Sequence, residues 1–176
     1  DFDEDGMIDF VTMYGYYYPN YNNFWHNNGD GTFTMNSNAV ASGSTWYNYA
    51  NCVGDFNDDG HLDIVIAYSY YLHFLEGKGD GTFKAPTQVV YYPSYTIYFV
   101  AEGDFNSDGD LDLVFANYND GLMYRAYGNG DGTFGTPAYT GTDLAPLTYD
   151  YPRGDSFDFD EDGDMDVIAY TDYYFG

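Results

Sequence analysis

Four short stretches of the chain place carboxylate and amide side chains at alternating positions around a glycine, a pattern that can hold a hard cation. The stretch at residues 55–63 reads Asp-Phe-Asn-Asp-Asp-Gly-His-Leu-Asp, with oxygen-bearing side chains at positions 1, 3, 5 and 9. Related stretches begin at Asp1, Asp104 and Asp158. Because calcium takes oxygen ligands from carboxylates, amides and backbone carbonyls, the four loops are interpreted as up to four Ca²⁺ sites.

The expected ligands are the side chains at positions 1, 3, 5 and 9 and the backbone carbonyl at position 7. In chain order they are Asp1, Asp3, Asp5, Met7 and Asp9; Asp55, Asn57, Asp59, His61 and Asp63; Asp104, Asn106, Asp108, Asp110 and Asp112; and Asp158, Asp160, Asp162, Asp164 and Asp166. The residue at position 4 is expected to face solvent. Whether the ions only stabilise the fold or also regulate it stays open.

The residues at position 12 of the four loops exclude an EF-hand. Its loop needs a glutamate at position 12 and a helix on each side. Position 12 here is Thr12, Ile66, Phe115 and Ala169, and the loops continue directly into apolar stretches such as Ile64-Val65-Ile66-Ala67.

Candidate catalytic groups are sparse. The three histidines, His26, His61 and His73, share no sequence context, and no nucleophile elbow, zinc signature or phosphate-binding loop is present. Paired acids, which could suggest glycoside hydrolysis, occur throughout the chain and therefore indicate nothing. The sequence predicts no enzymatic activity.

The composition limits the partners. With 29 acidic and 4 basic residues the net charge is −25, so nucleic acid and anionic membranes are excluded by repulsion and cations are favoured. A hydrophobic content of 44% predicts a globular chain. No apolar run is long enough to insert into a membrane. The single cysteine, Cys52, is expected to be a buried core residue.

The loops must be positioned by a repeated element. Their first residues are separated by 54, 49 and 54 residues, a period typical of propeller blades or solenoids. A Gly-Asp-Gly-Thr-Phe turn follows three of them, at residues 29–33, 79–83 and 130–134, and is typical of a hairpin. One unit then contains four short strands, near 98–101, 113–116, 122–127 and 137–139. This predicts an all-β chain of β-propeller blades.

We expect a single domain over residues 1–176, with repeats near 1–48, 49–96, 97–145 and 146–176. The first and last repeats are incomplete, so the chain holds about three and a half four-stranded blades.

The two motifs, recurring together in fixed order, resemble the FG-GAP/VCBS repeat family, which includes the calcium-binding blades of integrin α-chain propellers. The resemblance implies a propeller, typically seven-bladed, in which each calcium loop joins the first and second strands of a blade. Members serve in adhesion, in glycan binding and as accessory domains of enzymes. This chain departs from the family in length, since seven blades need roughly twice as many residues. It is therefore expected to belong to a longer propeller or to self-associate.

The chain also departs from the family in its 23 tyrosines, clustered at residues 16–18, 70–71, 91–92 and 173–174. Three roles stay open for them and for Trp25 and Trp46: packing between blades, contact between subunits, and contact with a glycan. The favoured interpretation is a non-catalytic, extracellular, calcium-binding module for adhesion or structural assembly. The alternative is a carbohydrate-binding module, attached to an enzyme in a longer chain.

Overall fold

The structure is a computed structural model that describes residues 1–12, 23–37, 48–93, 96–117, 121–143 and 152–171. Every regular element within these ranges is a β-strand, which confirms the predicted all-β class. Within the same ranges, no helix has the length and apolar character needed to cross a membrane.

The thirteen strands of the described residues form four antiparallel sheets in which neighbouring strands are consecutive in the chain. Blade 1 contains β1 (Phe10–Thr12), β2 (Asn23–Asn27) and β3 (Phe33–Ser37). Blade 2 contains β4 (Asn48–Gly54), β5 (Asp63–Tyr68), β6 (Tyr71–Leu75) and β7 (Thr87–Tyr91). Blade 3 contains β8 (Ile97–Gly103), β9 (Asp112–Asn117), β10 (Leu122–Ala126) and β11 (Ala138–Asp143). Blade 4 contains β12 (Pro152–Phe157) and β13 (Asp166–Thr171).

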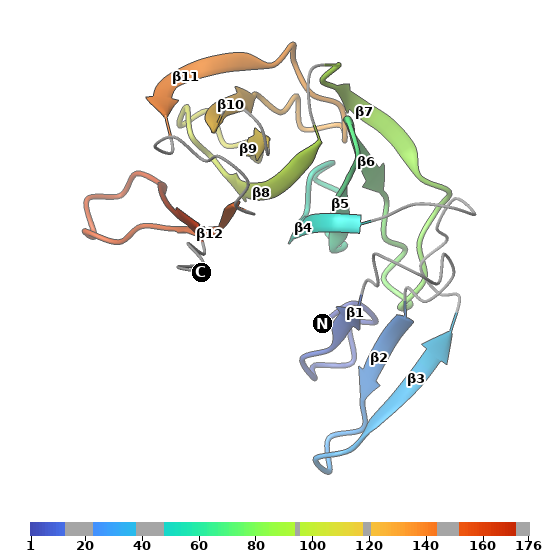
Figure 1. Ribbon diagram of the computed structural model, residues 1–176. Helices are drawn as coiled ribbons and strands as arrows, with labels where there is room; N and C mark the ends of the chain where they lie inside the picture. Colours follow the sequence, from blue (N-terminus) through green and yellow to red (C-terminus); the bar gives the residue numbers. More distant parts are fainter. Residues whose placement is uncertain (13–22, 38–47, 94–95, 118–120, 144–151, 172–176) are drawn as a thin grey trace, which may run out of the picture.

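The four sheets follow one another around an arc, with β3, β7 and β11 on the outside (Figure 1). The first strands of successive blades lie side by side, β4 against β8 and β8 against β12. This arrangement of about three and a half blades is the predicted propeller architecture.

The core lies between blades, and the second strand of each blade explains why. Along β5, Ile64 and Ile66 pack toward blade 1, whereas the alternate residues Val65 and Ala67 pack toward blade 3. Because successive side chains of a strand point to opposite faces, a strand between two neighbours must be apolar at every position. The unbroken apolar run after each acidic loop therefore reflects burial on both faces, and each blade depends on its neighbours for stability.

Local predictions hold where the structure describes them. The turn at residues 29–33 connects β2 to β3, and the other two turns close through bridges from Gly77 to Phe83 and from Gly128 to Phe134. Cys52 is buried in β4, before the second loop.

The described tyrosines pack mainly against one another. Tyr71 stacks on Tyr91 across two strands of blade 2. Tyr92 after β7 donates its hydroxyl to that of Tyr124 in blade 3 at 2.6 Å. These contacts favour packing within and between blades among the three roles considered. The clusters at residues 16–18 and 173–174 and Trp46 lie outside the described residues.

Candidate metal centres

The acidic loops, numbered 1 to 4 in chain order, comprise residues 1–9, 55–63, 104–112 and 158–166. Loops 2, 3 and 4 join the first and second strands of their blades, and loop 1 leads into β1. In loop 2, the residue before position 1, Gly54, pairs with position 9, Asp63; the corresponding pairs are Gly103–Asp112 and Phe157–Asp166. Position 9 is therefore the first residue of the second strand, at the base of the loop.

Three hydrogen bonds recur in all four loops and show that they share one conformation. The backbone N–H at position 2 donates to the position 9 carboxylate at 2.9–3.1 Å. The glycine N–H at position 6 donates to the position 1 carboxylate at 2.8–3.0 Å. The N–H at position 7 donates to the position 5 carboxylate at 2.8–3.0 Å. These bonds hold the carboxylates at positions 1, 5 and 9 in the same way in each loop.

Carboxylate oxygens approach one another closely in two loops. Those of Asp1, Asp3 and Asp5 lie within 4.8 Å of one another, as do those of Asp158, Asp160 and Asp166. In loops 2 and 3 position 3 is an asparagine, whose side-chain oxygen accepts from the N–H of position 5 and whose amide donates to that residue's carboxylate. Positions 1, 3, 5 and 9 therefore offer oxygen donors of the kind a calcium ion takes.

The glycine at position 6 and the residue at position 4 give the loop its sharp curvature. Position 4 adopts φ of 57–61° in all four loops, at Glu4, Asp58, Ser107 and Glu161. The four residues are exposed, as the sequence predicts. Gly6, Gly60, Gly109 and Gly163 have φ of 89–98°, which a residue with a side chain rarely adopts.

The position 9 carboxylates are buried in loops 1, 2 and 3, whereas Asp166 in loop 4 is not. Asp63 and Asp112 are both 0% exposed. Burial raises the pKa of Asp63 to about 6, although the hydrogen bonds from the N–H groups of Gly77 and Phe56 act to lower it. Burial also raises the pKa of Asp112 above its ordinary value. Each is an anion removed from water that a nearby cation would stabilise.

A glycine after the third strand supports the same carboxylate, and the sequence reasoning missed it. Gly77 donates its N–H to Asp63 at 2.7 Å and Gly128 donates to Asp112 at 2.8 Å. A Cβ at Gly77 would lie 2.1 Å from the carbonyl oxygen of Leu62, and one at Gly128 would lie 2.3 Å from that of Leu111. The signal was present, because both glycines stand two residues before a Gly-Asp-Gly-Thr-Phe turn.

The position 7 side chains of loops 1, 2 and 3 lie beside the first glycine of the Gly-Asp-Gly-Thr-Phe turn in their own blade. The ring of His61, expected at the surface, contacts the Glu4 carboxylate of loop 1, which raises the pKa of His61. Asp110 approaches the turn of its own blade at Gly130. The role of position 7 as a backbone-carbonyl donor stays a prediction.

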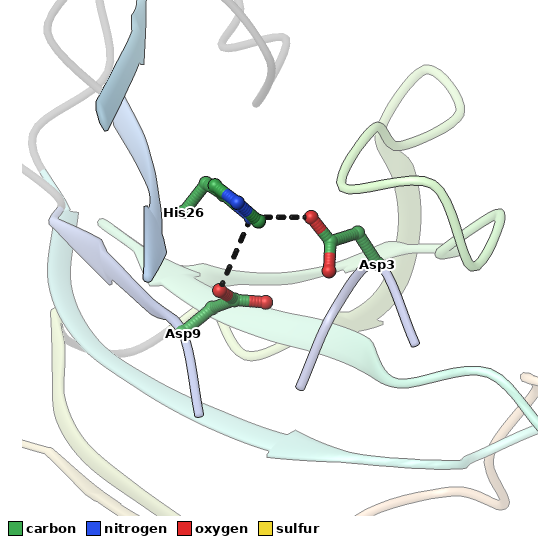
Figure 2. Close-up of side chains that lie close together, drawn as sticks. All are labelled: Asp3, Asp9 and His26. Carbon is green, nitrogen blue, oxygen red and sulfur yellow. Dashed lines mark hydrogen bonds and ion pairs between the residues drawn. The ribbon is translucent and has the colours of Figure 1, made fainter. Parts of the chain in front are cut away.

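Loop 1 contains a further group, the imidazole of His26 from β2, which the sequence did not connect with it. Figure 2 shows His26 facing Asp3 and Asp9, with Nδ1 2.7 Å from Asp3 Oδ2 and 3.8 Å from Asp9 Oδ1. In blade 1 the residue after it, Asn27, occupies the position of Gly77 and Gly128 and donates its N–H to Asp9 at 2.9 Å. The three side chains His26, Asp3 and Asp9 form a mixed nitrogen and oxygen cluster.

Blades of consecutive antiparallel strands, with an acidic loop after the first strand of blades 2, 3 and 4 and before β1 in blade 1, define a repeat propeller module. The FG-GAP-like repeat family matches the chain three times, over residues 1–66, 55–115 and 104–169, and the chain belongs to this family. No protein among the curated proteins matches the chain.

Among solved structures, the chain is similar to a lectin from Agrocybe aegerita, described as specifically recognising non-reducing terminal N-acetylglucosamine. The TM-score is 0.63 and the sequence identity 19%, over 92% of this chain and 43% of that one. The chain thus spans less than half the length of the lectin. At this identity the likeness shows the shared fold.

Proposed function

We propose that this chain is a non-catalytic, extracellular propeller module for adhesion or structural assembly, with a cation site in each acidic loop. The ion in each loop is Ca²⁺, and it joins the first and second strands of the blade. The 20 residues given above at positions 1, 3, 5, 7 and 9 supply the protein ligands.

The observation that carries the proposal is the fully buried carboxylate at position 9 of loops 2 and 3. Asp63 and Asp112 are stabilised only in part by backbone N–H groups, and burial raises the pKa of each. The carboxylates at positions 1 and 5 of the same loops add to this rise in pKa through their negative charge. A bound dication offsets both the burial cost and the mutual repulsion of these groups.

The extracellular assignment rests on calcium concentration. Oxygen-ligand loops of extracellular modules bind calcium with dissociation constants of about 10⁻⁴–10⁻³ M, which suits the calcium outside cells. Loops 2 and 3, with one amide in place of a carboxylate, are expected to bind more weakly than loops 1 and 4 where rigidity is equal.

Adhesion or assembly is supported by apolar side chains at the two ends of the arc. Blade 1 exposes Phe33 and Met35, and blade 4 exposes Ile168 and Tyr170, each by 44–55%. The equivalent faces of blades 2 and 3 are buried against neighbouring blades. Since a blade needs a neighbour to cover its faces, these ends suit another copy of the chain or further blades.

Calorimetric titration with Ca²⁺ and thermal unfolding with and without chelator test the proposal. We expect saturable binding of up to four ions and a melting temperature lowered by chelator. Mg²⁺ should substitute poorly, because it demands shorter bonds and near-octahedral geometry. A melting temperature unchanged by chelator at low salt would contradict the calcium assignment.

Glycan binding is the second candidate, favoured by the likeness to a lectin and by a groove between blades 2 and 3. The groove has a volume of about 610 Å³. Its lining combines the rings of Phe74 and Phe134 with polar groups of Glu76, Gln88 and Thr133. Apolar surface beside a few polar groups is the usual composition of a small-ligand site.

A glycan array separates the two candidates. Binding to defined glycans that is lost in Thr133→Val, with the melting temperature unchanged, would establish the second. Absence of binding across the array, with calcium binding intact, would leave the adhesive or structural role.

A further inference from the structure

Loop 1 differs from loops 2 and 3 in having an imidazole beside its carboxylates. His26 stands three residues before the Gly-Asp-Gly-Thr-Phe turn of blade 1. The same position holds Glu76 in blade 2 and Tyr127 in blade 3. Glu76 pairs with Lys84, and Tyr127 lies beneath the guanidinium of Arg125. The nitrogen donor is therefore particular to blade 1 among these three blades.

The imidazole lies among the loop carboxylates. Its Nδ1 is 2.7 Å from Asp3 Oδ2 and 3.8 Å from Asp9 Oδ1, and its Nε2 is 3.9 Å from Asp5 Oδ2. Ligands about 2.0–2.2 Å from a tetrahedral zinc ion are separated by roughly 3.3–3.6 Å. The two Nδ1 distances lie below and above this value, and the ligand atoms of His26, Asp3 and Asp9 all lie within 4.8 Å of one another, so the three side chains face one shared space (Figure 2).

The carboxylates are held in place and retain unused acceptors. The Asp9 side chain is 0% exposed, and the N–H groups of Phe2 and Asn27 fix its two oxygens at 2.9 Å each. The second oxygen of Asp3, Oδ1, and Oδ1 of Asp1 are inaccessible to solvent and accept no hydrogen bond. Buried acceptors of this kind are costly unless a donor or a cation satisfies them.

Donor type then decides which cation loop 1 prefers. Calcium prefers an all-oxygen shell, whereas imidazole nitrogen together with carboxylate suits zinc and other first-row dications. We propose that loop 1 is a zinc-selective site in which His26, Asp3 and Asp9 are the protein ligands. Loops 2, 3 and 4 remain oxygen sites for calcium. The inference rests on the proposed function in treating the loops as cation sites, and it changes that proposal in loop 1 alone, where Zn²⁺ takes the place of Ca²⁺ and three Ca²⁺ sites remain.

Titration with Zn²⁺ in the presence of roughly millimolar Ca²⁺, the extracellular range, tests the inference. We expect one equivalent of Zn²⁺ to be retained by the full chain. His26→Tyr, which introduces the blade 3 residue, should weaken it by at least about tenfold, since even outer-shell changes cost 10–100-fold in metal affinity. Glu4→Gln is the matched control, because Glu4 is an exposed carboxylate of loop 1 that pairs with His61 and lies outside the cluster. It should leave Zn²⁺ affinity unchanged.

Two further readouts locate the ion. Co²⁺ in place of Zn²⁺ should give visible absorption bands of a nitrogen and oxygen site that are lost in His26→Tyr. The His26 ring resonances should shift on Zn²⁺ addition, while those of His61 should not. Both measurements are independent of stability.

The outcomes are distinguishable. Displacement of Zn²⁺ by Ca²⁺, or Zn²⁺ affinity equal in the wild type and His26→Tyr, overturns the inference and leaves the calcium proposal intact. Retained, His26-dependent Zn²⁺ with no Ca²⁺ binding at the other loops supports the inference and contradicts the calcium proposal. Binding of four Ca²⁺ with no preference for Zn²⁺ also overturns the inference, and makes His26 only an ion-pair partner of Asp3.

Discussion

The backbone N–H of Gly81 donates a hydrogen bond of 2.9 Å to the carbonyl oxygen of Phe2, which joins the turn of blade 2 to acidic loop 1. The same bond runs from Gly132 in blade 3 to Phe56 in loop 2, also at 2.9 Å. The aromatic residue that ends the turn of blade 2 contacts the same loop residue, because Phe83 packs edge-on against Phe2. The two repeated motifs therefore contact each other across the boundary between blades, and loops 1 and 2 are each joined to the turn of the following blade.

The first prediction concerns the glycine of this contact. Gly81→Ala should lower the free energy of unfolding by about 1–2 kcal/mol for the positive φ of 72° and by roughly another 1–3 kcal/mol for overpacking. A Cβ at Gly81 would lie 2.5 Å from Cε1 of Phe24. Denaturant unfolding measures the loss.

Gly31→Ala is the matched control. Gly31 holds the same place in the turn of blade 1, with φ of 87°, but a Cβ there meets no atom within 4 Å. Gly31→Ala should therefore lower the free energy of unfolding only by the cost of the positive φ. Equal losses in the two variants would mean that the contact between blades adds nothing.

The sequence predicted the parts of this fold that depend on local pattern. Acidic positions at fixed spacing, a glycine at position 6 and an apolar run after position 9 specify the loop and the strand that follows it. Contacts between distant residues carry no such spacing, so the approach of His26 to loop 1 and of Gly81 to Phe2 became visible only in the folded chain. Gly77 is an intermediate case. The sequence shows that a glycine recurs at this place as Gly128, but only the folded chain shows that the carbonyl of Leu62 leaves no room for a side chain there.

The second prediction separates coordination from structural support within loop 2. Asp63→Ala should destabilise the chain both with calcium and with chelator, because it leaves the N–H groups of Phe56 and Gly77 without their acceptor. Buried unsatisfied donors cost about 1–3 kcal/mol each. Asp59→Ala should destabilise the chain much more with calcium than with chelator, since Asp59 is exposed and water can replace it as the acceptor for His61 and Asn57.

Asp58→Asn is the control for charge. It removes a carboxylate at position 4 and keeps a residue that tolerates the positive φ of 57°. Thermal unfolding and calcium titration of all three variants decide the prediction. A loss of calcium affinity in Asp58→Asn as large as in Asp59→Ala would mean that overall acidity, rather than coordination, attracts the ion.

The third prediction follows from the pKa of Asp63, which burial raises from an ordinary 3.8 to about 6. A carboxyl group whose pKa is higher in the folded than in the unfolded chain favours folding while it is protonated. In chelator, the stabilising contribution of Asp63 to the free energy of unfolding is therefore fully present below pH 3.8 and is lost as the pH rises through about 6. The two-unit shift corresponds to roughly 3 kcal/mol at most. With calcium the sign reverses, because the ion binds the deprotonated carboxylate.

Melting temperatures measured between about pH 4 and 7 should therefore fall with pH in chelator and rise with pH in calcium. Asp63→Asn should reduce both slopes, since its side chain does not titrate. Parallel slopes with and without calcium would show that Asp63 is not linked to an ion.

The last prediction concerns the exposed apolar ends of the arc. Met35 in β3 is 50% exposed and Ile168 in β13 is 49% exposed, whereas Ile66 and Phe115 in the intervening blades are fully or almost fully buried against neighbours. If other copies cover these ends, the association is of the head-to-tail kind, because the two surfaces differ. Met35→Glu and Ile168→Glu should each lower the mass measured by mass photometry. Tyr91→Glu, at a residue of blade 2 that is 53% exposed, adds the same charge away from either end and should leave it unchanged. An equal decrease in all three variants would assign the effect to added charge on a chain of net charge −25, and a monomeric wild type would contradict self-association directly.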